Sequence, residues 1–199
     1  MKEESLLLLS DLQKLINQVV LIDYTIIILG GGKMYLTLRD RDADKIIEYL
    51  KKKEDKIVIE TEINRKVNIK NKLVLRNLLF NRSIIPFAKL TEKNEIIRLG
   101  FLNPSMENLA KNYIIVQYLE LGDEEFVREY IQFAEDYCKK NGLGKIKVFI
   151  GEKVAGSNLQ EMVTCVEKNG FVKEVEYENV LGKQFLFARL VSGDTNADN

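Results

Sequence analysis

The stretch from Asn112 to Phe171 decides the fold of this chain. It reads NYIIVQYLEL (112–121), GDEEFVREYIQFAEDYCKKNG (122–142), KIKVFIG (145–151) and SNLQEMVTCVEKNGF (157–171). The first and third segments are apolar and rich in β-branched residues, which is typical of buried strands. The second and fourth are amphipathic and end in Asn-Gly, which is typical of helices. A strand–helix–strand unit of this length predicts a parallel pair with a right-handed crossover.

The helix expected between the two strands has clear boundary signals. Asp123 is a favourable N-cap, and Glu124 and Glu125 complement the positive end of the helix dipole. Asn141-Gly142 is a typical helix end. The sequence therefore predicts a helix over Asp123–Asn141 that crosses between two parallel strands.

The remaining elements are predicted from shorter patterns. Two closing strands, 172–180 and 184–191, are expected to run antiparallel after the second helix. Upstream, the patterns predict helices at 4–18, 40–53, 71–81 and 106–111, and strands at 20–29, 34–38, 56–62 and 95–101. The segment Gly30–Lys33 is glycine-rich, but it precedes a strand and lacks the Ser/Thr of a phosphate loop, so a hairpin turn is expected.

The order of elements from Asn112 onward resembles the GNAT superfamily of acyl-CoA N-acyltransferases. FAEDYCKKNGLGKIKV (133–148) resembles the family's third helix and fifth strand, and EKNGF (167–171) resembles the end of its fourth helix. The resemblance implies an α/β (α+β) fold: a mixed, mostly antiparallel sheet with flanking helices. It also implies acetyl-CoA as cofactor and an amine, on a small molecule or a protein, as acceptor.

The chain departs from the family where the cofactor would bind. In the family a glycine-rich turn lets backbone N–H groups close on the CoA pyrophosphate. The two glycine positions fall here on Glu125 and Val127, and three acids begin the helix at Asp123. The family's tyrosine acid aligns with Val166. These departures count against acetyl-CoA and leave two functions open: amine acylation, or a catalytically degenerate binding or regulatory protein.

The resemblance implies two candidate catalytic residues. Glu120, at the end of the fourth family strand, stands where some members keep a general-base glutamate. Tyr177 would replace the missing tyrosine acid if its strand points inward. A surface glutamate explains Glu120 equally well.

The resemblance also implies cofactor contacts. Backbone groups near Tyr118, Leu119 and Leu121 would hold the pantetheine arm and polarise the thioester carbonyl. Asn158 lies within one residue of an asparagine that often contacts CoA, although it also fits as a helix cap.

Composition narrows the classes of partner. The chain has 199 residues, with 30 basic and 30 acidic side chains, so neither nucleic acid nor a membrane is expected as a partner. Histidine is absent and the two cysteines, Cys138 and Cys165, are isolated, so no metal site is expected. A reduced cytoplasmic protein is expected, and a homodimer is compatible with the sequence.

Three regions are expected along the chain. Residues 1–85 form an N-terminal α/β region, which either is a diverged GNAT half-copy or only shares the order of elements of any α/β chain. Residues 86–192 form the GNAT-like core, and residues 193–199 form a small, polar and mobile tail.

Overall fold

The computed structural model of this protein describes residues 28–30, 33–52, 57–61, 69–104, 112–179 and 182–191. Four predictions lie wholly or mainly outside them: the helices at 4–18 and 106–111, the strand at 20–29 apart from its end, and the tail at 193–199.

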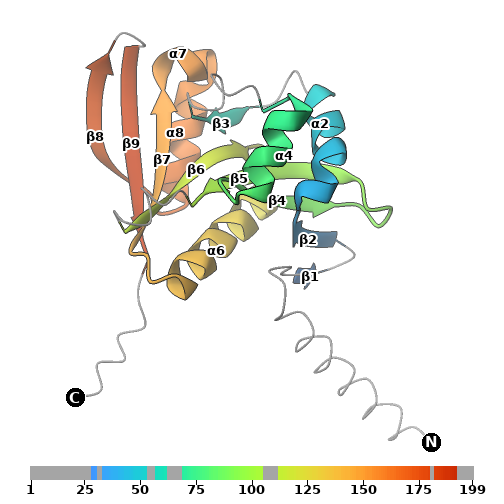
Figure 1. Ribbon diagram of the computed structural model, residues 1–199. Coiled ribbons are helices and arrows are strands. Elements are labelled where there is room, and N and C mark those ends of the chain that lie inside the picture. The colour runs from blue at the N-terminus through green and yellow to red at the C-terminus, as the bar shows by residue number, and fades with distance from the viewer. Residues whose placement is uncertain are drawn as a thin grey trace, which may run out of the picture.

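One mixed sheet of nine strands organises the described residues (Figure 1). Its order is β1-β2-β4-β5-β6-β7-β9-β8, and β3 is added to β6. Among the strands of the described residues only β6 and β7 pair in parallel, so the expected mixed, mostly antiparallel sheet is confirmed. The strands are β1 (Ile28–Gly30), β2 (Lys33–Thr37), β3 (Val58–Glu60), β4 (Ile85–Leu90), β5 (Ile96–Asn103), β6 (Tyr113–Glu120), β7 (Lys145–Gly151), β8 (Val172–Asn179) and β9 (Gly182–Leu190).

The strand–helix–strand unit lies at the centre of this sheet. β6 pairs in parallel with β7 from Tyr113↔Lys145 to Val116↔Val148, and α6 (Glu124–Lys140) connects them. The predicted parallel pair and helix are therefore confirmed. β9 then pairs antiparallel with β7, and β8 lies outside it at the end of the strand order.

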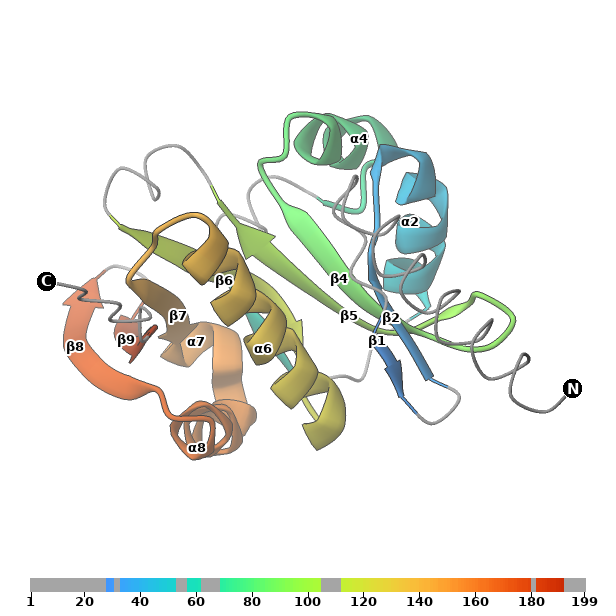
Figure 2. The ribbon, with the colours of Figure 1, turned by 90° about the horizontal axis from the view of Figure 1, so that it is seen from below.

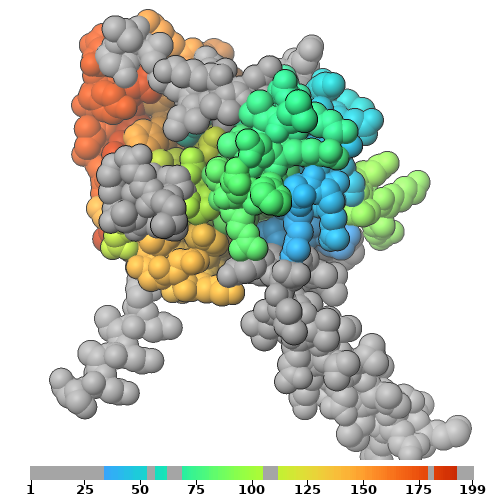
Figure 3. Space-filling model, in the orientation of Figure 1, coloured from blue at the N-terminus to red at the C-terminus, as the bar shows by residue number. Residues whose placement is uncertain are grey.

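Helices cover both faces of the sheet (Figure 2). α2 (Ala43–Lys51) and α4 (Lys72–Phe80) lie on one face, and α6 and α8 (Leu159–Lys168) lie on the other. α2 and α4 form a continuous outer surface in the space-filling view (Figure 3). Neighbouring strand residues alternate between the two apolar cores: Phe87 packs in the α6 core and Ala88 in the α2 core.

The N-terminal strands join the same sheet. β1 and β2 pair antiparallel with Gly30 opposite Lys33, which fits the expected hairpin; residues 31–32 between them lie outside the described residues. β2 pairs with β4 across the proposed boundary at residue 85, and β3 pairs with β6 rather than with β2. The half-copy at 1–85 stays a prediction.

A close approach fixes α6 on the sheet. Tyr130 is fully buried, and its hydroxyl donates a hydrogen bond to the Phe101 carbonyl over 2.8 Å. The ring lies directly against Gly100 of β5, where an added Cβ would be 2.4 Å from ring carbon Cε2. Gly100 is therefore required by the packing of α6.

Candidate functional site

β6 and β7 separate halfway along β6, and this defines the candidate site. The pairing of β5 with β6 shifts register between Phe101↔Tyr118 and Leu102↔Val116, so Gln117 is an extra, bulged residue. β7 pairs with β6 only as far as Val116. We call the region where the two strands no longer pair the fork. It lies between residues 117–121, which are the second half of β6 and the residue after it, and residues 149–151 at the end of β7.

The fork is filled by β3. This strand runs antiparallel to β6 with Ile59 opposite Leu119. β5 already occupies one edge of β6 at that residue, so β3 lies on the other edge, the one that faces β7. The Leu121 N–H donates to the Ile57 carbonyl over 2.9 Å, and the Thr61 N–H donates to the Gln117 carbonyl over 3.1 Å. The backbone edge of β6 is therefore used by the chain itself.

Side chains complete the filling of the fork. Ile59 is 1% exposed and belongs to the same apolar core as Ile150, Ala155 and Met162. Val58 packs against the opposite core. A tight pocket between β3, the end of β7 and α7 (Glu152–Ala155) is lined mainly by apolar side chains.

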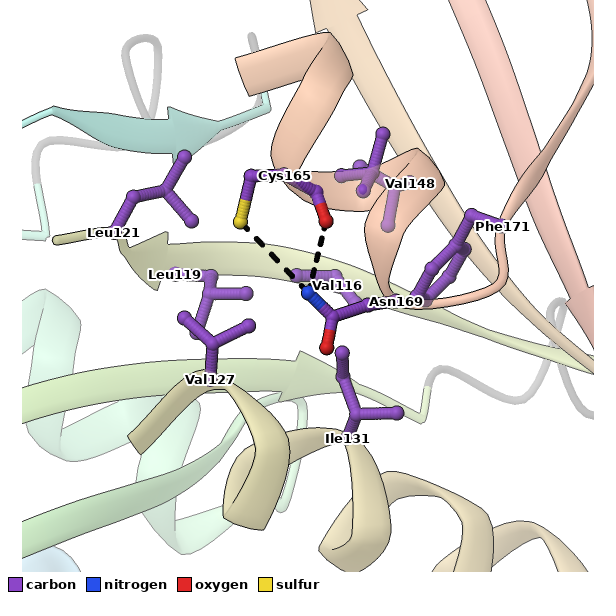
Figure 4. A pocket seen from close by; sticks show the side chains of 10 residues that line it. Val116, Leu119, Leu121, Val127, Ile131, Val148, Cys165, Asn169 and Phe171 are labelled. Carbon is purple, nitrogen blue, oxygen red and sulfur yellow. Dashed lines mark hydrogen bonds between the residues drawn. The ribbon is translucent and has the colours of Figure 1, made fainter. Parts of the chain in front are cut away.

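A small apolar pocket remains on the α6 side of the fork (Figure 4). It is lined by Val116, Leu119, Leu121, Val127, Ile131, Val148, Cys165, Val166, Asn169 and Phe171. Val127 and Val166, which the sequence resemblance aligned with family glycine and tyrosine positions, both line it. The Asn169 side-chain amide donates to the Cys165 carbonyl over 2.8 Å, and burial raises the pKa of the Cys165 thiol. The pocket thus presents apolar groups, the Asn169 amide and a thiol whose raised pKa disfavours the reactive thiolate.

The start of α6 has a side-chain cap and ion pairs made by the chain's own groups. The Asp123 side chain accepts a hydrogen bond from the Phe126 N–H over 3.0 Å, which is the expected N-cap. Lys89, with 6% of its side chain exposed, donates to Asp123 over 2.8 Å and to Glu125 over 3.0 Å. Lys168 pairs with Glu124 over 2.6 Å at the surface.

Protonation at this helix start follows from these contacts. Burial opposes ionisation of Asp123, but the hydrogen bonds from Lys89 and the Phe126 N–H outweigh it, so the pKa of Asp123 is lowered. The hydrogen bond from Lys168 lowers the pKa of Glu124. The paired lysines therefore relieve the repulsion expected between the three acids, and the acids in turn neutralise the cations that could attract a pyrophosphate.

Glu120 lies at the end of β6 in a closed network of hydrogen bonds. It is completely buried and accepts bonds from the Tyr49 hydroxyl over 2.6 Å and the Leu99 N–H over 3.2 Å. The Tyr118 hydroxyl donates to its other oxygen over 3.2 Å. Burial, followed by the nearby Glu120 carboxylate, raises the pKa of both tyrosines. The surface reading of Glu120 is therefore wrong, and its carboxylate faces protein groups.

The other candidate residues are spread over the molecule. Leu119 and Leu121 line the apolar pocket, and β3 pairs with their backbone segment. Asn158 directly precedes α8, and its side chain makes no capping hydrogen bond there. Tyr177 is 43% exposed on β8, and β7 and β9 separate that strand from β6. Tyr177 and Glu120 are therefore not brought together.

Sequence reasoning missed three participants: Tyr49, Lys89 and the docking of β3. Lys89 had a usable signal, because it is a lone cation within the apolar strand IPFAKL and lysine is rarely buried without a partner. Tyr49 lies on the buried face of α2 beside Ile46 and Leu50, where an aromatic residue suggests only core packing. In the described residues, no group of three or more metal-ligating side chains comes together, and none of the helices is long and apolar enough to cross a membrane.

No family model and no curated protein matches this chain. Solved structures do. The ribosomal-protein-S5-alanine acetyltransferase of Vibrio fischeri superposes with a TM-score of 0.61 at 12% identity, covering 84% of this chain and 97% of that one. An acetyltransferase of the GNAT family from Streptococcus pneumoniae has a TM-score of 0.61 at 12% identity, covering 80% and 99%. The SpeG spermidine N-acetyltransferase of Vibrio cholerae, in a mutant form, has a TM-score of 0.56 at 18% identity, covering 79% and 95%.

Proposed function

The chain has the GNAT fold, and from this premise we propose that it is a binding or regulatory protein that does not use acetyl-CoA. The observation that carries the proposal is the position of β3 in the fork. The pantetheine arm of an acyl-CoA would need the backbone edge of β6 from Tyr118 to Leu121. There the Leu121 N–H already donates a hydrogen bond to the Ile57 carbonyl.

The residues present do not fit acetyl-CoA at the helix start either. A pyrophosphate needs free N–H groups, close backbone approach and positive potential. Here Asp123 takes up the Phe126 N–H, and Glu125 and Val127 carry side chains at the glycine positions. The start of α6 is therefore unsuited to hold the pyrophosphate of acetyl-CoA.

Amine acylation is the second candidate function, and one observation favours it. β6 keeps a bulge and diverges from β7, and a buried carboxylate, Glu120, lies at that end of the strand. If the chain were an acyltransferase, Glu120 would be its base and an amine its acceptor. Spermidine is a suitable first acceptor to test, since one structural neighbour is a spermidine N-acetyltransferase. A cytoplasmic location and a homodimeric state remain further proposals.

Isothermal titration with acetyl-CoA separates the two functions. We expect no heat of binding at micromolar concentrations and no rise in the unfolding midpoint when acetyl-CoA is present at about 100 times a micromolar Kd. An incubation with acetyl-CoA and spermidine, followed by mass spectrometry, should give no acetylated product. Micromolar binding, together with product that disappears in Glu120→Gln, would make the chain an acyltransferase.

A further inference from the structure

β3 shows which kind of ligand the fork accepts. It is an extended peptide segment held by backbone hydrogen bonds, as in the addition of a peptide strand to a sheet edge. Within the described residues it pairs only with β6, and its ladder is only three residues long, with two flanking bonds. A short ladder held on one edge has few backbone hydrogen bonds for another strand to replace.

The fork also selects side chains. The central position, Ile59, is buried in the core that contains Ile150, Ala155 and Met162, so it requires an apolar and preferably β-branched residue. The preceding position, Val58, packs against the opposite core. A strand that fits therefore carries two adjacent apolar residues that point to opposite faces of the sheet.

The residue directly after β3 fits the fork poorly. Thr61 is 8% exposed, and its hydroxyl is buried without a hydrogen bond in the described part of the chain. A buried hydroxyl without a partner weakens the strand that carries it. A strand with valine at this position would keep the shape and remove the unsatisfied group.

We propose that the fork between β6 and β7 is a binding site for an extended peptide strand of another polypeptide, and that β3 is its internal competitor. The partner has apolar residues at the positions of Val58 and Ile59 and an apolar, β-branched residue at that of Thr61. This inference rests on the proposed function, because it names the ligand class of a GNAT-fold binding protein.

The test uses a synthetic peptide with the sequence of residues 56–62, KIVIETE, and the full chain. Ile59→Asp places a carboxylate in the apolar core and should release β3 from the fork. The variant should bind the peptide roughly tenfold or more tightly than the unmodified chain, because the site is no longer occupied. A peptide carrying Thr61→Val should bind about tenfold more tightly than KIVIETE, and one carrying Ile59→Asp should not bind.

Hydrogen exchange locates the peptide. The Leu121 amide, which donates to Ile57, should exchange faster in Ile59→Asp and regain protection when the peptide is added. The Val191 amide, which donates to Gly144, is the internal control and should not change. If Ile59→Asp does not fold, Ile59→Ala gives the same comparison with smaller shifts.

Two results would overturn the inference. One is a Leu121 amide that exchanges rapidly in the variant and stays unprotected with the peptide. The other is protection of that amide by acetyl-CoA instead of the peptide, which would make the fork a thioester site that β3 blocks. Micromolar binding of acetyl-CoA to the unmodified chain is a separate result that refutes the proposed function itself.

Discussion

Lys89 is the residue that pairs with two of the three acids at the start of α6. Its ammonium contacts Asp123 and Glu125 from β4, in a position where almost none of its side chain meets solvent. Without it, Glu125 would lose this ion pair and Asp123 would keep, within the described residues, only the longer ion pair with Arg98, over 3.9 Å. The acids at this helix start therefore depend on a cation from another strand.

We expect Lys89→Met to lower the free energy of unfolding by about 2 kcal/mol, a value between those for exposed and for fully buried pairs. Urea unfolding followed by circular dichroism at pH 7 measures the change. Lys168→Met, which removes the exposed partner of Glu124, is the matched control and should have little effect. Equal losses in the two variants would contradict the role given to Lys89.

The lowered pKa of Asp123 predicts how stability depends on pH. Its folded pKa lies below the unfolded value of about 3.9, so its contribution is present above pH 4 and is lost as the pH falls through the folded pKa. Unfolding midpoints between pH 7 and pH 2.5 should therefore fall less steeply for Asp123→Asn than for the unmodified chain. Parallel profiles would show that another acid controls the decline.

Thr61 gives a prediction of the opposite sign. Thr61→Val removes a buried hydroxyl that has no hydrogen bond in the described residues and keeps the side-chain shape, so we expect about 1 kcal/mol of added stability. The measurement is the urea midpoint, with Thr164→Val on α8 as the comparison, because the Thr164 hydroxyl accepts a hydrogen bond at the surface. A destabilised Thr61→Val would mean that the hydroxyl has a partner.

The sequence predicted some helices and strands together with their neighbours in the sheet, and others without their neighbours. The unit β6–α6–β7 was predicted because its signals are local: an apolar run, an acid cap, an amphipathic period and an Asn-Gly end. The strand at β3 was predicted from alternation, but its position depends on pairing with Leu119, far along the chain. The alternation of apolar and polar residues within a strand does not show which distant strand it pairs with. For the same reason Tyr49 and Lys89 were not connected to Glu120 and Asp123, and the exposed position of Tyr177 was not foreseen.

The close contact between Tyr130 of α6 and Gly100 of β5 predicts that a larger residue at position 100 destabilises the packing of the helix on the sheet. Gly100→Ala places a Cβ against the Tyr130 ring, so we expect a loss of about 2–3 kcal/mol. Gly144→Ala is the control, since its nearest neighbour is the end of the exposed Asn112 side chain, which can turn away with the loss of one hydrogen bond to the Gly144 N–H. If Gly100→Ala is no worse than Gly144→Ala in thermal unfolding, α6 does not lie this close to the sheet.

At the scale of the whole molecule, the two apolar cores share one sheet. Phe87 and Ala88 of β4 enter opposite cores, as do Phe101 and Leu102 of β5. If the central strands separate, each core loses the face of the sheet against which its helices pack. The described part of the chain is therefore expected to behave as one cooperative unit, even though residues 1–85 and 86–192 were distinguished by sequence pattern.

We expect a single unfolding transition in urea. Tyrosine fluorescence and far-ultraviolet circular dichroism should give the same midpoint, since two-state unfolding makes different probes coincide. The chain has eight tyrosines and no tryptophan, so tyrosine is the natural fluorescent reporter. Two separated midpoints would show that the two sequence regions are independent folding units.

The pairing of β3 with β6 also has a consequence for synthesis. Ile59 meets Leu119, so the ribosome must add about 60 further residues before the acceptor edge is made. At about 5–20 residues per second this takes roughly 3–12 s. During that time the nascent chain exposes Ile57, Val58 and Ile59, a β-prone apolar segment of the kind that chaperones protect. Slower translation between codons 60 and 120 would prolong this exposure and reduce the soluble yield.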